Sequence, residues 1–195
     1  MGNRAVITTR NKDLGVYLHW NGGRDSVEAF LLYCKLKKYR APENDCYGWA
    51  RLCQVIGNYF GGELSLGIDR YDRLDADNGD NGVYIIENWE IVHREFYEGE
   101  EQDTYTLYDM LKDINASQPE AEQFSEQVLL DAVGSYMEPI TNTQIRAIHA
   151  AIAGLGIPDD RYRQVLNGLF NVDSCKKLSE KQASVLIETL NKMKG

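Results

Sequence analysis

Two helix-start signals near the C-terminus constrain the fold of this 195-residue chain more than any other feature of its sequence. In each, a hydroxyl residue is followed three positions later by Gln: Thr141 with Gln144, and Ser179 with Gln182. This spacing is typical of a capping box, in which the two side chains satisfy backbone amides at the start of a helix. An apolar stripe at helical spacing follows each box, and a third stripe lies between them. The sequence therefore predicts a three-helix module at residues 139–195.

The first half of the chain alternates between strand-like and helix-like segments. Short runs rich in β-branched and aromatic residues predict strands at 5–9, 16–20, 64–68, 83–86 and 90–97. Apolar stripes of helical period predict helices at 25–38 and 47–60, the first opened by a capping box of Asp25 and Glu28.

These segments predict an α+β fold in three parts. A small mixed or antiparallel sheet with two helices is expected over residues 1–100. Helical stripes and a high density of carboxylates predict an acidic helical connector over residues 101–138. The three-helix module follows at residues 139–195.

Charge is distributed unevenly along the chain, whose formal net charge is −9. Residues 63–138 hold 20 acidic and 4 basic residues, whereas both ends of the chain are slightly basic. A segment of this sign repels duplex DNA and attracts basic surfaces. It is either a solvated face that keeps the protein in solution or a surface that docks on a basic protein. The candidate partner-binding residues are Glu98, Glu100, Glu101 and Asp103, which are expected to lie in an exposed loop.

A second candidate site is the junction at residues 20–26, where a strand, two glycines and a helix start follow one another. Amides at a helix N-terminus can hold a phosphate, and the candidate anion- or nucleotide-binding residues are His19, Gly22, Gly23 and Arg24. The stretch lacks both the P-loop pattern and the G-x-G-x-x-G fingerprint. A plain tight turn is therefore the alternative interpretation.

A metal site and an active site have weaker support. Asp75, Asp77 and Asp80 suggest an oxygen-rich cation site, but the spacing fails the EF-hand pattern because Gly79 takes its fifth position and Ile86 its twelfth. A polar hairpin loop explains these residues better. No G-x-S-x-G motif and no recognisable pair of catalytic carboxylates is present. The sequence therefore predicts no cofactor and favours a binding protein over an enzyme.

The sequence also bears on the compartment. No apolar run approaches the ~20 residues of a membrane-spanning helix, and the N-terminus has no apolar core of a secretory signal. The four cysteines form no C-x-x-C pair and predict reduced thiols. We expect a cytoplasmic protein without a membrane partner.

The C-terminal pattern resembles a helical module of phage proteins. The residues that carry the resemblance are Ile140-Thr141, Gln144, Ile148, Leu155-Gly156, Val172-Asp173-Ser174, Leu178-Ser179, Gln182-Ala183, Leu186-Ile187 and Leu190. They resemble the C-terminal part of the GemA-type regulatory proteins of Mu-like phages and the tails of some phage single-strand-annealing recombinases. Residues 15–23 are similar to uncharacterised proteins from phages of gut Firmicutes. The resemblance implies a phage or prophage origin and a docking or DNA-associated role in the host cytoplasm, and it carries over no catalytic residue.

Charge and resemblance together favour a non-catalytic, phage-type binding protein. Such a protein would inhibit or modulate a host nucleic-acid-handling or defence system, as anti-CRISPR proteins do, by docking on a basic nucleic-acid-binding surface. One alternative is an accessory factor in phage DNA recombination or transposition. Another is a nucleotide-binding protein or enzyme that uses the Gly22-Gly23 junction.

Overall fold

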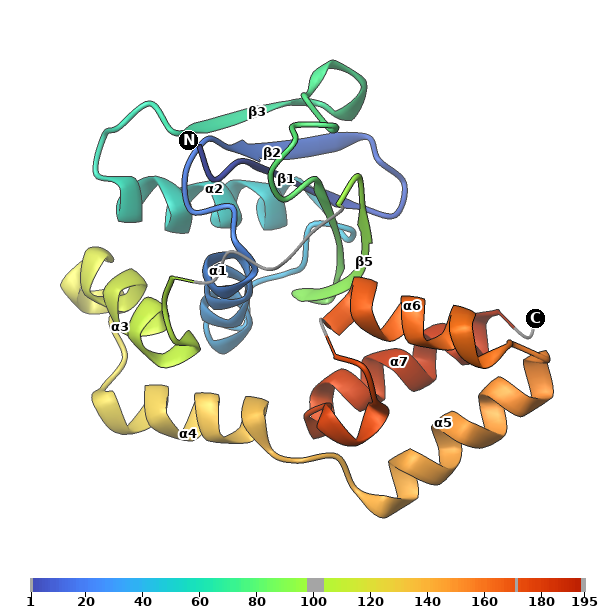
Figure 1. The fold of residues 1–195 in the computed structure, drawn as a ribbon. Helices are drawn as coiled ribbons and strands as arrows, with labels where there is room; N and C mark the ends of the chain where they lie inside the picture. The colour runs from blue at the N-terminus through green and yellow to red at the C-terminus, as the bar shows by residue number, and fades with distance from the viewer. Residues whose placement is uncertain (1, 98–103, 171, 194–195) are drawn as a thin grey trace. The chain divides into compact units, whose positions relative to one another are not determined.

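The computed structural model describes residues 2–97, 104–170 and 172–193 (Figure 1). The chain divides into two compact units, Met1–Leu130 and Asp131–Gly195. Most of the predicted connector, residues 101–138, therefore belongs to the first unit. In the described part of the chain, no helix is long and apolar enough to cross a membrane.

The first unit is built on a five-stranded mixed sheet with the strand order β3-β2-β1-β4-β5. The strands are β1 (Ala5–Thr9), β2 (Leu14–Leu18), β3 (Leu66–Arg70), β4 (Val83–Glu87) and β5 (Glu90–Glu95). The central pair β1 and β4 is parallel, and the other neighbours are antiparallel. Every residue of β1 is buried, as expected for the middle strand of a sheet. The sheet and its helices confirm the predicted α+β class.

Three helices of the first unit build its core together with the sheet. They are α1 (Arg24–Leu36), α2 (Cys46–Phe60) and α3 (Leu107–Ser117). α1 and α2 lie on one side of the sheet, with α1 against β5 and α2 against β3, and α3 packs on both helices (Figure 1). The fully buried side chains of these three helices include Phe30, Tyr33, Leu52 and Met110. α3 falls in the predicted helical connector, so the first unit combines a connector helix with the two helices predicted for residues 1–100.

The start of α1 differs from the prediction. The expected capping box of Asp25 and Glu28 is absent, since Gly23 is the N-cap residue and has no side chain to accept a hydrogen bond. The Asp25 carboxylate instead accepts hydrogen bonds from the amides of Thr104 and Tyr105, at 2.8 and 2.9 Å. A partly buried contact between distant parts of the chain has replaced the local one.

The ends of α2 follow the local chemistry closely. The Asp45 carboxylate accepts hydrogen bonds from the amides of Tyr47 and Gly48, at 2.9 and 3.3 Å, and thereby caps the first turn. At the other end Gly61 has a φ of 62°, a left-handed conformation that favours glycine and ends the helix. α2 therefore ends at Phe60, as predicted for the helix at 47–60.

The second unit contains α5 (Asn142–Leu155), α6 (Asp159–Phe170) and α7 (Glu180–Lys192), with the short 3₁₀ helix η3 (Cys175–Lys177) before α7. α4 (Glu126–Met137) spans the division between the units. Both predicted capping boxes are confirmed. The backbone N–H of Gln144 donates to Thr141 Oγ1 at 3.2 Å, and the backbone N–H of Gln182 donates to Ser179 Oγ at 3.1 Å. The three predicted helices after residue 139 are therefore present, and α5 and α7 begin at the predicted capping boxes.

Candidate functional site

The turn between β2 and α1 shapes one side of the candidate site. Asn21 has a φ of 55°, and the next amide, that of Gly22, donates a hydrogen bond to the carbonyl of Asn3 at 2.7 Å. A Cβ on Gly22 would lie only 2.6 Å from that same oxygen, so a larger residue does not fit here. The turn leaves Trp20 on the surface with 43% of its area exposed.

The residues predicted to bind an anion gather at this turn. His19 is exposed, and its ring lies 5.1 Å from that of Trp20. Gly23 caps α1, whereas Arg24 is buried and donates from Nε to Glu28 Oε1 at 2.8 Å. Since this guanidinium is held by a carboxylate one helical turn away, it contributes little attraction for a phosphate. Anion binding at the junction stays a prediction, with the plain turn as its alternative.

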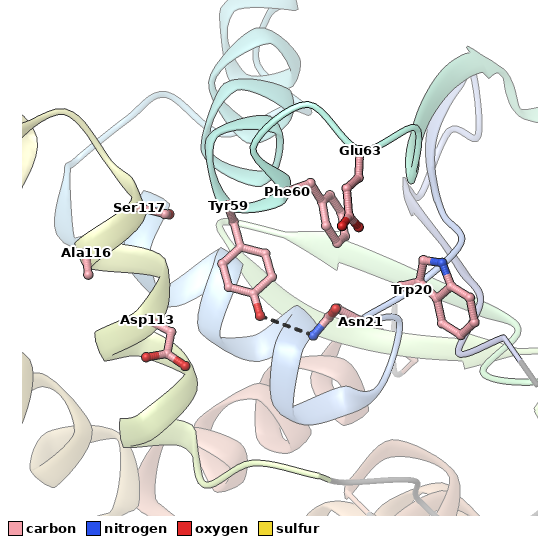
Figure 2. A pocket seen from close by; sticks show the side chains of 8 residues that line it. All are labelled: Trp20, Asn21, Tyr59, Phe60, Glu63, Asp113, Ala116 and Ser117. Carbon is pink, nitrogen blue, oxygen red and sulfur yellow. Dashed lines mark hydrogen bonds between the residues drawn. The ribbon is translucent and has the colours of Figure 1, made fainter.

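A pocket of about 670 Å³ opens beside the turn (Figure 2). Its walls come from three segments: the turn after β2, the end of α2 with the residues that follow it, and the second half of α3. The lining residues are Trp20, Asn21, Tyr59, Phe60, Glu63, Asp113, Ala116 and Ser117. We call this the aromatic–acidic pocket.

The aromatic side chains of Tyr59 and Phe60 are held by packing at the end of α2. The ring of Tyr59 meets that of Phe30 edge-on at 5.4 Å and that of Phe60 at 5.5 Å. Asn21 Nδ2 lies 3.5 Å from the Tyr59 hydroxyl, the contact drawn as a dashed line in Figure 2. Asp113 lies on α3 and Glu63 beyond the end of α2, with Tyr59 between them in this view.

Hydrogen bonds between α2 and the end of α3 hold α3, the helix that carries Asp113, in place. Asn58 Nδ2 donates to Gln118 Oε1 at 2.9 Å. The side chain of Gln118 is buried, and its Nε2 donates to the backbone carbonyls of Val55 and Ile114, at 3.1 and 3.0 Å. A buried, satisfied amide of this kind fixes the spacing of the two helices. α3 therefore presents Asp113 from a rigid support.

The charge of the pocket has one sign. Glu63 and Asp113 are exposed, and neither forms an ion pair with another described residue. None of the eight lining residues is basic. Burial raises the pKa of Tyr59, and neighbouring Tyr105 and Asp113 raise it further. The Tyr59 hydroxyl therefore stays protonated at neutral pH and can donate a hydrogen bond.

This combination of groups suits a cation. The face of an aromatic ring attracts an ammonium or a guanidinium, and a nearby carboxylate adds a charge-assisted hydrogen bond. The same carboxylates repel a phosphate. The geometry therefore supports recognition of a Lys or Arg side chain.

No family model, curated protein or solved structure matches the chain. The function is therefore inferred from the geometry and charge of the site itself.

The other predicted site residues have different outcomes. Glu98, Glu100, Glu101 and Asp103 lie outside the described residues. Asp80 accepts a hydrogen bond from Arg4 Nε at 2.7 Å, and this contact lowers the pKa of the carboxyl. Asp75 is exposed, 4.0 Å from the Arg4 guanidinium, and Asp77 is exposed as well. Among the residues that the structure describes, no group of three or more His, Cys, Asp and Glu side chains could hold a metal ion.

Sequence reasoning identified one side of the pocket and missed the rest. Trp20 and Asn21 belong to the predicted junction, but Glu63 and Asp113 carry no motif. The available indication is that Asp113 stands off the apolar stripe of its helix, which includes Met110 and Ile114. Nothing local shows that Asp113 lines the same pocket as Trp20.

Proposed function

We propose that this is a non-catalytic binding protein whose aromatic–acidic pocket receives a Lys or Arg side chain of a basic partner protein. The observation that carries the proposal is the pairing of Glu63 and Asp113 with aromatic rings in one pocket without a basic lining residue. Because no other described residue neutralises these two carboxylates, a partner's cation can bind them without displacing an internal ion pair.

The wider proposal is that the partner belongs to a host nucleic-acid-handling or defence system, which the protein inhibits or modulates in an anti-CRISPR-like manner. Two observations support it: the excess of acidic residues over 63–138, and the resemblance of residues 140–192 to phage modules. A surface that normally holds nucleic acid is basic, and an acidic protein can compete for it.

The pocket contributes specificity more than total affinity. A cation over an aromatic face contributes about 0.5–2 kcal/mol, depending on how far it is desolvated. An exposed ion pair adds about 0.2–1 kcal/mol. These magnitudes are enough to distinguish a basic side chain from a neutral one, whereas a stable complex needs a larger surrounding interface.

The test uses Trp20 as a built-in reporter. Trp49 and Trp89 are buried, so a change of tryptophan fluorescence on ligand addition reports the exposed Trp20. The probes are three short peptides with blocked termini that differ only in a central Arg, Lys or Gln. We expect a saturable change with the Arg and Lys peptides and none with the Gln peptide.

Charge-neutralising variants locate the binding. Asp113→Asn and Glu63→Gln should each weaken binding of the Arg peptide by up to about fivefold, the equivalent of one exposed ion pair. Glu120→Gln is the matched control, since Glu120 is an exposed carboxylate of the same unit outside the pocket. Equal binding of the Gln peptide, or an equal loss in Glu120→Gln, would refute the proposal. A response to ATP that Asp113→Asn does not alter would instead support the nucleotide alternative.

A further inference from the structure

The second unit holds a pocket of its own, with a volume of about 460 Å³. It is bordered by residues of α5 and α6 and by the segment around η3. A thiol, an imidazole and a phenol line it together: those of Cys175, His149 and Tyr162. Their chemistry is unrelated to the aromatic–acidic pocket of the first unit.

The thiol and the imidazole are in contact. Cys175 Sγ lies 3.8 Å from His149 Nε2, within hydrogen-bonding range for sulfur. Cys175 is buried and His149 is exposed, so the imidazole can exchange a proton with solvent while it contacts the sulfur. An imidazole in this position can take the proton of a thiol and leave the more nucleophilic thiolate.

The buried hydroxyl of Tyr162 is a second observation, independent of the contact between Cys175 and His149. Tyr162 is 8% exposed, and its hydroxyl makes no hydrogen bond of ordinary geometry to any described residue. Burial raises its pKa, and the neighbouring Cys175 thiol raises it further. The hydroxyl therefore stays protonated at neutral pH, and it borders the same pocket as the sulfur, where it can donate to a negative charge. A buried polar group without an ordinary partner calls for a functional explanation.

The remaining charges of the pocket compensate one another. Asp159 pairs with Arg163 and Asp173 with Lys177, each at 2.9 Å. These carboxylates therefore do not select a strongly cationic reagent, and the lining Lys176 is exposed to solvent. A small uncharged electrophile is the class of reagent that fits.

The other cysteines lack this setting and serve as internal references. Burial raises the pKa of Cys34 and of Cys53, which disfavours their thiolates. Cys46 is exposed, and it has no hydrogen bond to a histidine among the described residues. Only Cys175 combines a neighbouring base with a neighbouring hydroxyl donor in the described part of the chain.

We propose that Cys175 is a nucleophilic thiol that forms covalent adducts with small uncharged carbon electrophiles, with His149 as the base and Tyr162 as a donor to the sulfur. In the reaction with an alkyl halide, His149 takes the thiol proton and the sulfur electron pair forms a bond to carbon. The carbon–halogen bond breaks and the halide leaves with its electrons. The proton on the imidazole then passes to solvent.

The test is competitive labelling of the full chain with iodoacetamide at pH 7, read by mass spectrometry of cysteine peptides at short times. Cys175 should be modified at least as fast as the exposed Cys46, and well before Cys34. His149→Gln keeps a hydrogen-bonding amide but removes the base, and should slow labelling of Cys175 by at least about tenfold without affecting Cys46. Tyr162→Phe should slow it by a smaller factor.

Two outcomes would overturn the proposal. If Cys175 reacts only after a denaturant is added, the thiol is a packing group like Cys34. If His149→Gln leaves the rate unchanged, the imidazole is not its base. Thermal melts of each variant show whether the fold is intact, and His149 is exposed, so its substitution should not unfold the unit.

Discussion

Replacing Asp25 should loosen the start of α3 and with it the first unit. Both carboxylate oxygens are in use: Oδ2 accepts the amides of Thr104 and Tyr105, and Oδ1 lies 2.6 Å from the amide of Ser26. A hydrogen bond to a charged group contributes about 1.5–3 kcal/mol net. Because Thr104 and Tyr105 are exposed and their amides can take up water, Asp25→Ala should cost about 3 kcal/mol, toward the low end for two such bonds. Asp25→Asn should cost roughly half as much, since its amide oxygen can still accept both hydrogen bonds but carries no charge.

Urea denaturation of the full chain followed by circular dichroism measures the loss, and amide hydrogen exchange locates it. The exchange of Thr104 and Tyr105 should speed up more than that of the central strand β1. Asp72→Asn provides the matched control, because Asp72 is an exposed carboxylate that pairs with Arg70 at the surface, where ion pairs contribute about 0–1 kcal/mol. A loss for Asp25→Ala no greater than that of Asp72→Asn would refute the assignment of Asp25 as the anchor of α3.

Two further predictions concern local contacts. Ser179→Ala removes the acceptor of the second capping box and should destabilise the C-terminal unit by about 1 kcal/mol, measured as a shift of its unfolding transition in urea. Asp80→Asn should lower stability at pH 7, because Arg4 holds the pKa of Asp80 below its ordinary value of 3.8. A carboxyl group whose pKa is lowered by folding stabilises the folded state at pH values above its ordinary pKa. This stabilisation is lost as the pH falls through the lower pKa of the folded state. The difference between wild type and Asp80→Asn in urea denaturation should therefore shrink below about pH 4; a difference that grows there would contradict the ion pair.

Features that depend on neighbours in sequence were predictable. The two capping boxes, the glycine end of α2 and the three C-terminal helices each follow from residues within a few positions of one another. The interactions that stabilise these features involve residues close together in sequence, so the sequence pattern alone is enough to predict them. The α+β class followed in the same way, from the change of hydrophobic period between strands and helices.

Features that depend on distant partners were not predictable. The spacing of Asp25 and Glu28 satisfies the capping rule, but Asp25 binds amides almost 80 positions away, a contact that no local pattern encodes. The aromatic–acidic pocket has the same origin, since Trp20, Glu63 and Asp113 stand on segments that meet only when α3 packs on α1 and α2. Local propensity decides where an element begins, whereas packing decides which side chains share a site.

The acidic segment and the pocket would act at different stages of binding. Complementary charges on exposed groups raise the association rate more than the affinity, and screening confines their effect to about 8 Å at physiological salt. The excess of carboxylates over residues 63–138 would therefore act mainly by guiding the last part of the encounter. Glu63 and Asp113 belong to the same excess, yet they border a pocket with aromatic walls and can hold a cation after contact is made. A chain that carried only the diffuse charge would attract many basic proteins equally. The pocket adds a requirement of shape, because one basic side chain must enter it beside Trp20 and Tyr59, and that requirement can distinguish one basic surface from another.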